Sequence, residues 1–385
     1  MSGVRVLVVS HACAVPINRG KLRALAARPG LELSVLVPAR WRERGQAYTT
    51  CPGEESGYRV FSGGIFFRGR VGGHFYRSGL LRALREARPE VIHLEEEPWS
   101  LAAGQVLAAA ALWRPRPALL ILSWENIEGV PSLRLQRAIE RAALRRAEVL
   151  IAGGRTARER LIRLGARPEK VEVLHQFGLD PGTFRPPAPG ERPGVFTVGF
   201  AGRLVREKGV DVLLRALAAL GGEWRALLVG DGAQRPELEA LAASLGIRER
   251  VEFTGWVDQP EVPACLRRMH AMVFHSRTTP AWAEQFGHPL IEAMSCGAVP
   301  VGSDSGEIPH VVGREGLIVP EGDAAALAAA LGRLRGEPGL RGRLEAAGRA
   351  RVLREFTWEA LAARTFALYE RALAARGARD KVSAR

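Results

Sequence analysis

Short runs of hydrophobic residues recur along the first half of the chain, and helical stretches separate them. The runs hold four to eight mostly β-branched or leucine residues, which is typical of strands buried on both faces of a parallel sheet. They lie at residues 4–10, 31–38, 91–94, 118–124, 149–152 and 171–175. Stretches such as residues 21–27 and 133–147 are rich in alanine and arginine and suit helices. This alternation predicts right-handed βαβ units and a doubly wound sheet.

A proline-rich segment at residues 180–194 interrupts the alternation, because its five prolines and three glycines disfavour strand and helix interiors. The runs then resume at residues 195–202, 226–230, 251–254, 271–275, 299–302 and 316–319. Long helices are expected over residues 340–375, with an interruption near 356–358. The sequence therefore predicts an α/β protein of two Rossmann-like, doubly wound parallel-sheet domains facing a central cleft. The expected parts are residues 1–180, a linker at 181–194, a second domain at 195–355, and a C-terminal helix at 356–385 that crosses back to the first domain.

The 385 residues carry a formal net charge of +14, which raises the question of a nucleic-acid partner. Only four of the 55 basic residues are lysines, and the arginines are dispersed among glutamates along the whole chain. A nucleic-acid-binding face would be clustered, so no such partner is expected. An anionic membrane surface or an anionic substrate fits the charge better.

The apolar runs are too short for a membrane span of roughly 20 residues, and the first of them ends at His11 without a basic leading segment. The four cysteines form no C-x-x-C pair, so their spacing indicates neither a zinc site nor a disulfide framework. We therefore expect reduced thiols and a cytoplasmic location, with peripheral contact to the inner membrane face as a further hypothesis.

A basic segment, Phe-Ala-Gly-Arg-Leu-Val-Arg-Glu-Lys-Gly-Val-Asp at residues 200–211, follows the first strand expected in the second domain. Gly202 permits a sharp turn after that strand. Arg203 and Lys208 then lie at the carboxyl end of the strand, near the N-terminus of a helix expected at residues 212–220. Two cations beside a helix N-terminus form a good diphosphate site. Either cation alone would be interpreted as a solvated loop charge.

A second segment, residues 284–297, combines two glutamates with a helix start. Pro289 suits the first helical position, so a short helix is predicted to begin near His288, with free N–H groups that can face an anion. Glu284 precedes this helix and Glu292 lies one turn inside it. Both carboxylates can accept hydrogen bonds from sugar or ribose hydroxyls. The alternative is an ordinary helix start with a solvated Glu292.

These two segments together resemble the retaining glycosyltransferases of family 4. The shared patterns are E-x7-E, F-G-x-P-L-x-E-A-M-x-C-G-x-V-P-V and G-R-L-x-x-E-K-G-x-D. The resemblance is close over the C-terminal half and loose over the N-terminal half. It implies the GT-B architecture, with a nucleotide-sugar donor bound to the C-terminal domain and an acceptor bound to the N-terminal domain.

The resemblance also implies roles for individual residues. Arg203 and Lys208 neutralise the donor diphosphate, and Glu284 holds hydroxyls of the transferred sugar, so these three form the predicted catalytic group. Glu292 accepts hydrogen bonds from the ribose. The other predicted donor contacts are Gly202, Gly230, Asp231, Trp256, Val257, Phe286, Gly287, His288, Pro289 and Leu290.

The N-terminal half departs from the family in two loops. The first loop, residues 11–20, lacks the family's glycine pair, and Asn18 and Arg19 are candidates for the same work. A glutamate stands where many members have a second histidine, and His93 is expected to be structural. The remaining acceptor-side candidates are Glu95, Glu96, Trp99 and Trp124. At least one carboxylate of residues 95–97 is expected to face the cleft, whereas the tryptophans suit either sugar stacking or core packing.

No metal site and no cofactor are expected. Successive side chains at residues 95–97 diverge, the chain has no Asp-x-Asp motif, and the family's enzymes use basic residues and helix dipoles in place of a metal. The nucleotide sugar, with UDP, GDP or ADP as its nucleotide, is a substrate. The acceptor is expected to be a sugar, a polyol or a lipid-linked glycan.

Three other functions fit the sequence less well. A nucleotide-sugar 2-epimerase of the same fold is disfavoured by the combination of E-x7-E with the basic segment. An NAD-dependent oxidoreductase is disfavoured because the first loop lacks G-x-G-x-x-G. A nucleic-acid-binding protein is disfavoured by the dispersed arginines.

Two features of the first half suit an anionic membrane or an amphipathic acceptor. One is the loop at residues 66–77, which mixes aromatics, arginines and glycines. The other is the arginine-rich helix at 133–147, with an apolar stripe of Leu135, Ile139 and Ala142. The alternative is a mobile surface loop and a solvated helix face.

Overall fold

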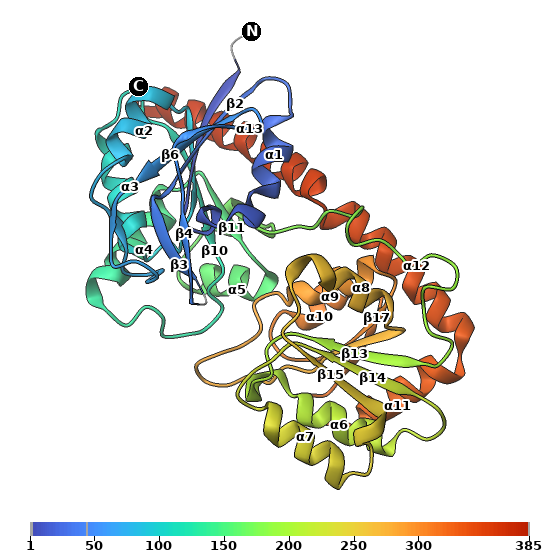
Figure 1. The fold of residues 1–385 in the computed structure, drawn as a ribbon. Helices are drawn as coiled ribbons and strands as arrows, with labels where there is room; N and C mark the ends of the chain where they lie inside the picture. The colour runs from blue at the N-terminus through green and yellow to red at the C-terminus, as the bar shows by residue number, and fades with distance from the viewer. Residues whose placement is uncertain (1–2, 44, 384–385) are drawn as a thin grey trace. The chain divides into compact units, whose positions relative to one another are not determined.

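The computed structural model describes residues 3–43 and 45–383, with side chains up to residue 378. The chain forms two compact units (Figure 1). Unit 1 comprises residues 1–178 and 358–385, and unit 2 comprises residues 179–357. Within the described residues, no helix combines the length and the apolar composition that a membrane span requires.

Unit 1 is built on a sheet whose described strands run in the order β12-β11-β10-β9-β1-β2-β6-β5. Its strands are parallel except at the edge, where β5 runs antiparallel to β6. Their bounds are β1 Val4–Ser10, β2 Leu31–Pro38, β5 Gly53–Glu55, β6 Tyr58–Gly63, β9 Val91–Glu95, β10 Ala118–Ser123, β11 Val149–Ala152 and β12 Val171–Val173. The central strands are buried along nearly their whole length, because helices cover both faces of the sheet.

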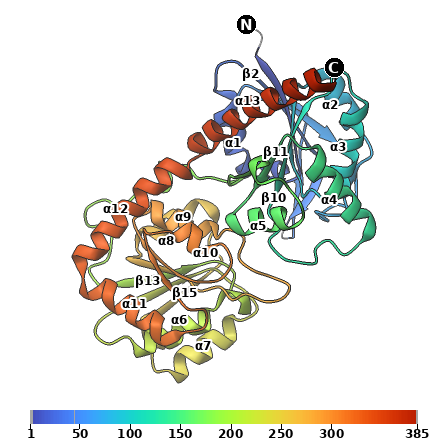
Figure 2. The same ribbon diagram turned by 180° about the vertical axis from the view of Figure 1, so that it is seen from behind.

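The helices of unit 1 are α1 Gly20–Ala26, α2 Leu80–Ala87, α3 Leu101–Leu112, α4 Arg134–Arg146, α5 Arg155–Arg163 and α13 Trp358–Ser383. Two hairpins complete it, β3 Arg40–Glu43 with β4 Gln46–Thr49, and β7 Ile65–Phe66 with β8 Phe75–Tyr76. The C-terminal helix α13 lies beside α1 in Figures 1 and 2. Gly20 allows this approach, since a Cβ there would lie only 2.2 Å from the ring of Trp358.

Unit 2 has a parallel sheet in the order β15-β14-β13-β16-β17-β18. The strands are β13 Thr197–Ala201, β14 Arg225–Val229, β15 Val251–Gly255, β16 Ala271–Phe274, β17 Val299–Ser303 and β18 Leu317–Val319. The helices are α6 Val210–Ala219, α7 Arg235–Ser244, α8 Val262–Arg267, α9 His288–Ser295, α10 Ile308–Val312, α11 Ala324–Gly336 and α12 Pro338–Glu355. The interruption expected near residues 356–358 separates α12 from α13.

The proline-rich segment at residues 181–194 packs onto unit 2. Arg192 donates from Nη2 to the carbonyl oxygen of Gly297 at 2.7 Å and pairs with Glu345 at 2.9 Å. The segment is therefore part of the second unit in the structure, where the sequence suggested a separate linker.

Both sheets contain a topological switch point. In unit 1 the chain moves from β1 to β2 on one side, and β9 later pairs with the other side of β1. In unit 2 it moves from β13 through β14 to β15, and β16 then pairs with the other side of β13. Ligands of open α/β sheets bind outside the carboxyl ends of the strands at such points. The loops after β1, β9, β13 and β16 are therefore the expected positions of ligand-binding residues.

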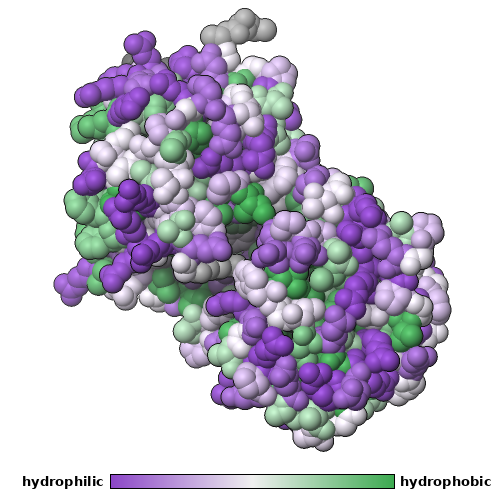
Figure 3. All heavy atoms as spheres, in the orientation of Figure 1, coloured by the Kyte–Doolittle hydropathy of each residue, from purple (hydrophilic) through white to green (hydrophobic). Residues whose placement is uncertain are grey.

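Hydrophilic residues predominate on the face drawn in Figure 3, with smaller hydrophobic areas between them. The most exposed large hydrophobic side chains of the described residues include Leu112, Leu133, Leu135 and Trp256. None of these belongs to the strands, so the surface pattern agrees with cores built around the two sheets.

Candidate functional site

The switch point of unit 2 brings two of the predicted catalytic residues into contact. Lys208 ends the short 3-10 turn after β13, and Glu284 lies in the loop after β16. Lys208 Nζ is 2.5 Å from Glu284 Oε2, which also accepts a hydrogen bond from Ser276 Oγ at 3.1 Å. The two charged side chains are only 12% and 11% exposed. They meet although they are 76 positions apart, because β13 and β16 are neighbours in the sheet.

Aromatic rings fix the ammonium group of Lys208. Its Nζ lies 4.7 Å from the ring centroid of Phe274 and 4.9 Å from that of Trp282. Cation–π attraction at such distances stabilises a positive charge. The site therefore holds a preorganised cation at the carboxyl end of β13.

Arg203 lies between β13 and this turn, and its side chain is exposed. Its guanidinium forms no ion pair with the described residues, in contrast to Lys208. The loop that carries it is rigidly held, since the N–H of Leu204 donates to the carbonyl oxygen of Asp231 at 2.9 Å. An open guanidinium on a fixed loop is well suited to bind an anion.

The loops after β13 and β14 approach each other closely at Gly230. Its φ is +128°, and a Cβ there would lie 2.0 Å from the carbonyl oxygen of Gly202, so a side chain is excluded. Asp231 accepts hydrogen bonds from the N–H of Gly232 and from Arg235, at 2.7 and 3.1 Å. The carboxylate of Asp231 thus stabilises the loop. The predicted contact of Asp231 with the donor stays a prediction.

The helix α9 begins at His288, as predicted, after Gly287 with a φ of +81°. Gly287 has no side chain that could cap the helix start, Pro289 has no N–H, and the N–H of Leu290 donates to the carbonyl oxygen of Gly287 at 2.8 Å. The positive end of the helix dipole, and not a row of free N–H groups, therefore favours an anion beside α9. Glu292 is one turn inside α9, with its side chain 12% exposed, and its Oε1 is 3.6 Å from His288 Nδ1. The side chains of Phe286 and Leu290 are buried, so a donor contact at these two positions would have to involve the backbone.

Trp256 follows β15 and is 71% exposed. Because β15 lies two strands from β13, Trp256 is displaced from the basic loop by about 10 Å, or two interstrand spacings. The half-buried Val257 follows it. Between them lies the loop after β14, where Gly230 packs against Gly202 and donates its N–H to the carbonyl oxygen of Gly255 at 3.0 Å.

Two family models match the chain. The model described as glycosyl transferases group 1 matches residues 184–351, and the model described as a glycosyl transferase 4-like domain matches residues 17–176. The 2-deoxystreptamine glucosyltransferase of Streptomyces kanamyceticus is 30% identical over 304 residues, covering 73% of this chain and 77% of that protein. The chain belongs to the family 4-like glycosyltransferases.

Other relatives and solved structures agree with this assignment. The D-inositol 3-phosphate glycosyltransferase of Xylanimonas cellulosilytica is 34% identical over 60% of this chain and 59% of its own length. The sucrose-phosphate synthase of Thermosynechococcus elongatus superposes with a TM-score of 0.74 at 22% identity, over 96% of this chain and 99% of that chain. HepE of Anabaena, solved with UDP and glucose, has a TM-score of 0.67 at 19% identity, over 95% of this chain and 99% of that chain. The glycosyltransferase thus has the GT-B architecture.

At the switch point of unit 1, the glycosyltransferase buries Glu95 in an ion pair with Lys21 of α1. The carboxylate also accepts a hydrogen bond from Gln176 Nε2 at 3.0 Å. Burial acts to raise its pKa, but the ammonium of Lys21 outweighs this and holds the pKa of Glu95 at about 2. Glu95 is therefore a charged anchor inside unit 1, which differs from the cleft-facing role expected for this cluster.

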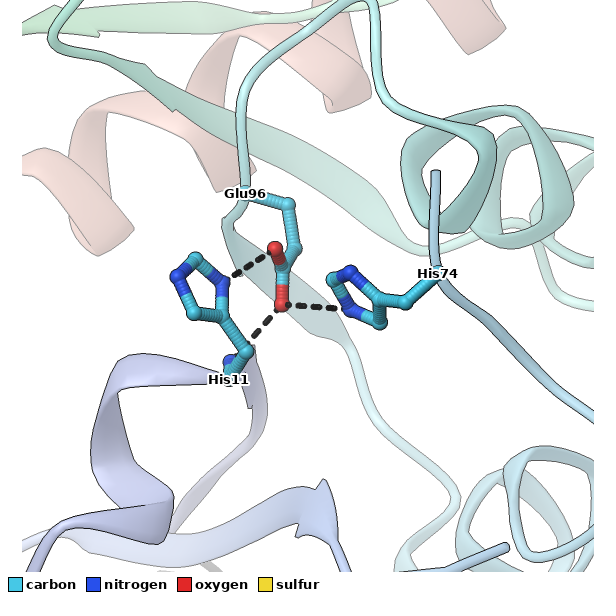
Figure 4. A group of neighbouring side chains, drawn as sticks. All are labelled: His11, His74 and Glu96. Carbon is cyan, nitrogen blue, oxygen red and sulfur yellow. Dashed lines mark hydrogen bonds and ion pairs between the residues drawn. The ribbon is translucent and has the colours of Figure 1, made fainter. Parts of the chain in front are cut away.

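Glu96 points to the other side and lies between two histidines (Figure 4). It accepts hydrogen bonds from the backbone N–H and from Nδ1 of His11, at 2.7 and 2.5 Å. Its Oε1 lies 3.6 Å from Nε2 of His74. Burial acts to raise its pKa, but the two histidines outweigh this and lower the pKa of Glu96 to about 2. Sequence reasoning missed this cluster, because His11 and Glu96 are 85 positions apart and follow no spacing pattern.

Glu97 is the third carboxylate of this run, and it too has protein partners. Its two oxygens accept from Ser123 Oγ at 2.8 Å and from the backbone N–H of Trp124 at 2.7 Å. Burial raises its pKa to about 7 in spite of these bonds. All three carboxylates of residues 95–97 therefore have partners within unit 1, and the expectation that at least one of them faces the cleft stays a prediction.

The first loop is braced by the two residues proposed to replace the glycine pair. Asn18 donates from Nδ2 to the carbonyl oxygen of Ala12 at 2.9 Å. Arg19 is buried, pairs with Glu55 and donates to the carbonyl oxygen of Cys13 at 2.7 Å. Both side chains shape the loop from within, and the guanidinium of Arg19 already has its partners.

The two tryptophans pack within unit 1. Trp124 stacks on Phe177 with ring centroids 6.3 Å apart and lies against Gly153, where a Cβ would be 2.2 Å from its ring. Trp99 lies against Gly72 in the same way, since a Cβ at Gly72 would be 2.0 Å from the ring of Trp99. Of the two interpretations left open by the sequence, these contacts favour core packing.

Proposed function

We propose that the chain is a retaining hexosyltransferase that moves a sugar from a nucleotide-diphosphate-sugar to a hydroxyl group of an acceptor. The observation that carries this proposal is the contact of Lys208 with Glu284 at the switch point of unit 2. The exposed Arg203 and the N-terminus of α9 belong to loops at the same edge of the sheet. Cations, the positive end of a helix dipole and a carboxylate at one edge of the sheet match a diphosphate attached to a sugar.

In the proposed reaction, Arg203 and Lys208 offset the negative charge that develops on the leaving phosphate. Such stabilisers are effective when they are held in place beforehand, as Lys208 is by Glu284 and two aromatic rings. The acceptor oxygen bonds to the anomeric carbon on the face that the diphosphate leaves. The bond from that carbon to the phosphate oxygen breaks, and this oxygen takes the acceptor's proton. The anomeric configuration is retained, with no covalent glycosyl-enzyme.

Glu284 is proposed to accept hydrogen bonds from hydroxyls of the transferred sugar, and Glu292 from the ribose. Both carboxylates are largely buried. A donor that lacks the matching hydroxyl would leave a buried carboxylate without its hydrogen bond, so the site should discriminate strongly against such a donor. Neutralisation of the diphosphate by two cations and α9 makes a metal at the donor phosphate unnecessary.

UDP is the first nucleotide to test. HepE of Anabaena, which shares the fold, has been solved with UDP and with UDP-glucose. Among the relatives are a 2-deoxystreptamine glucosyltransferase and D-inositol 3-phosphate glycosyltransferases. Their names make cyclic polyols the first acceptors to test, followed by sugars and lipid-linked glycans.

A screen of nucleotide sugars against acceptors, read by mass spectrometry, tests the proposal. The expected product is an acceptor one hexose heavier, and NMR should show the anomeric configuration of the donor. An inverted product would refute the retaining mechanism. Conversion of the donor to its 2-epimer without any acceptor would show that the protein is an epimerase and not a transferase.

A further inference from the structure

The cluster of His11, His74 and Glu96 lies at the switch point of unit 1. His11 directly follows β1, Glu96 directly follows β9, and these strands are neighbours. His74 reaches the same place from the loop before β8. The carboxyl edge of a sheet at a switch point is where a ligand is expected. Glu96 is among the acceptor-side candidates, but neither the proposed donor site nor the proposed transfer step uses these three residues.

The backbone fixes the tautomer of His74. Its Nδ1 faces the carbonyl oxygens of Arg70 and Val71 at 3.2 and 3.0 Å. Carbonyl oxygens only accept, so Nδ1 carries a hydrogen, and in the neutral ring Nε2 then carries a lone pair. This Nε2 is fully buried and has no hydrogen-bond partner among the described residues.

The lone pair of His74 points toward a carboxylate. Nε2 is 3.6 Å from Glu96 Oε1, which is too long for a hydrogen bond. Two acceptors would repel each other there unless a proton or a metal ion lay between them. Ligands bound to one tetrahedral zinc ion at about 2.0–2.1 Å are themselves separated by about 3.4 Å. The observed separation of 3.6 Å is close to this value, and the remaining ligand atoms, which lie within 4.8 Å of one another, would have to move closer together when the ion binds.

We propose that His11 Nδ1, His74 Nε2 and a carboxylate oxygen of Glu96 bind a divalent transition-metal ion of the Zn²⁺ class. The three ligand atoms lie within 4.8 Å of one another (Figure 4). Two imidazole nitrogens and one carboxylate oxygen suit zinc, and three protein ligands leave a fourth position for water or a ligand oxygen. The side chain of His11 is 16% exposed, so an ion can enter from its side. Binding displaces the proton that His11 Nδ1 shares with Glu96.

The surroundings hold the ligands in position. A metal-binding histidine usually donates its other ring N–H to a carbonyl or carboxylate oxygen, as His74 Nδ1 does to these two carbonyl oxygens. The ring of Trp41 packs against both imidazoles, with centroids 4.8 Å from His11 and 5.2 Å from His74. The backbone N–H of His11 orients Glu96. Such support reduces the reorganisation that metal binding requires.

Zinc titration of the chelator-treated, full-length protein tests the proposal. Calorimetry and elemental analysis should give one zinc ion per chain, with proton release on binding. His74→Gln and Glu96→Gln should each weaken zinc binding by more than the roughly 10–100-fold typical of changing a residue that only supports a ligand. His175→Gln is the matched control in the same unit and should bind zinc as the wild type does.

X-ray absorption at the zinc edge of the wild-type protein is independent of how the variants fold. It should show two imidazole nitrogens and an oxygen at about 2.0–2.1 Å. Absence of a stoichiometric zinc ion, or folded His74→Gln and Glu96→Gln variants that bind as tightly as the control, would overturn the proposal. So would a spectrum with fewer than two imidazoles. None of these outcomes bears on donor binding in unit 2, so the proposed function is tested separately.

Discussion

At the switch point of unit 2, Lys208 and Glu284 are about one-tenth exposed, and Arg203 on the same loop is open to solvent. At the corresponding point of unit 1, Lys21 and Glu95 are 5% and 1% exposed, and each is closed off by protein. The two sheets share the same switch topology. They differ in whether the charges at the carboxyl edge are neutralised by partners within the unit.

This difference separates two uses of the same position. In unit 2 a guanidinium is left over after the ion pair has formed, so the edge can accept an anion. In unit 1 the charges of Glu95 and Glu96 are compensated by a lysine and by histidines. A buried, compensated cluster fixes the loops of the unit, and in the case of Glu96 it provides the ligands of the proposed metal site.

The largest effect is expected from Lys21→Met, which leaves the carboxylate of Glu95 buried without its cation. Breaking a buried ion pair from one side costs about 3–5 kcal/mol. Urea unfolding followed by circular dichroism should show this loss in the transition of unit 1. The double variant Lys21→Met/Glu95→Gln should recover much of it, because no charge is then left uncompensated. Wild-type stability of Lys21→Met would contradict the proposed anchoring role.

In unit 2, removal of a cation should lower the turnover number of the enzyme. Arg203→Ala and Lys208→Gln should each lower kcat by roughly 10²-fold or more, as expected when one electrostatic stabiliser of the transition state is removed. Arg206→Ala is a matched control, since Arg206 is another exposed arginine of the same loop. Near-wild-type turnover in Arg203→Ala and Lys208→Gln would remove them from the catalytic group. Equal losses in the control would point to the loop and not to these cations.

A smaller effect concerns the pH dependence of unit 1. Burial raises the pKa of Glu97 from 4.5 to about 7, so the folded state holds this proton more tightly than the unfolded state. The resulting stability is fully present below pH 4.5 and is lost as the pH rises through about 7. Unfolding of the wild type and of Glu97→Gln should therefore be compared from about pH 5 to about pH 8. The wild type should lose stability relative to the variant, and parallel curves would show that Glu97 titrates normally.

The smallest effect is expected at the surface of unit 1. Phe66 and Phe67 are 48% and 57% exposed, and Leu135 on α4 is 64% exposed. The loop and the helix are neighbours, since Gln136 Nε2 donates to the carbonyl oxygen of Gly72. As a proposal, weak binding to anionic vesicles should fall as salt rises and weaken when Phe66, Phe67 and Arg68 become Ser. Absence of co-sedimentation at low salt would leave a soluble acceptor.

Much of the fold could be predicted because its central strands are continuous apolar runs. Each predicted strand is present, with ends shifted by no more than two residues. The parallel strand β6 was missed, since Arg59 and Ser62 interrupt its hydrophobic pattern. The edge strand β5 is mostly polar and carries no signal at all. Helix α4 was placed correctly, but Leu135 of its expected apolar stripe is exposed, and Glu140 is buried against Arg160.

The two sites were predictable to different degrees. In unit 2 the residues that meet lie in two contiguous motifs, and the helix start at His288 can be seen in the sequence. In unit 1 the ligand set of the proposed metal site comes from three separate loops, so only the tertiary structure brings it together. The packing of Trp99 and Trp124 likewise depends on distant glycines at residues 72 and 153.

Nucleotide binding to the unmodified protein tests the central claim most directly. Titration calorimetry with UDP, GDP, ADP and NAD, in EDTA and again in Mg²⁺, should show binding of one nucleoside diphosphate and no binding of NAD. The affinity should be the same in both buffers and about 10–100-fold weaker in Arg203→Ala, as expected for one charge-assisted hydrogen bond. Binding of NAD alone, or binding of a nucleoside diphosphate only with Mg²⁺, would contradict a cationic, metal-independent donor site at the switch point of unit 2.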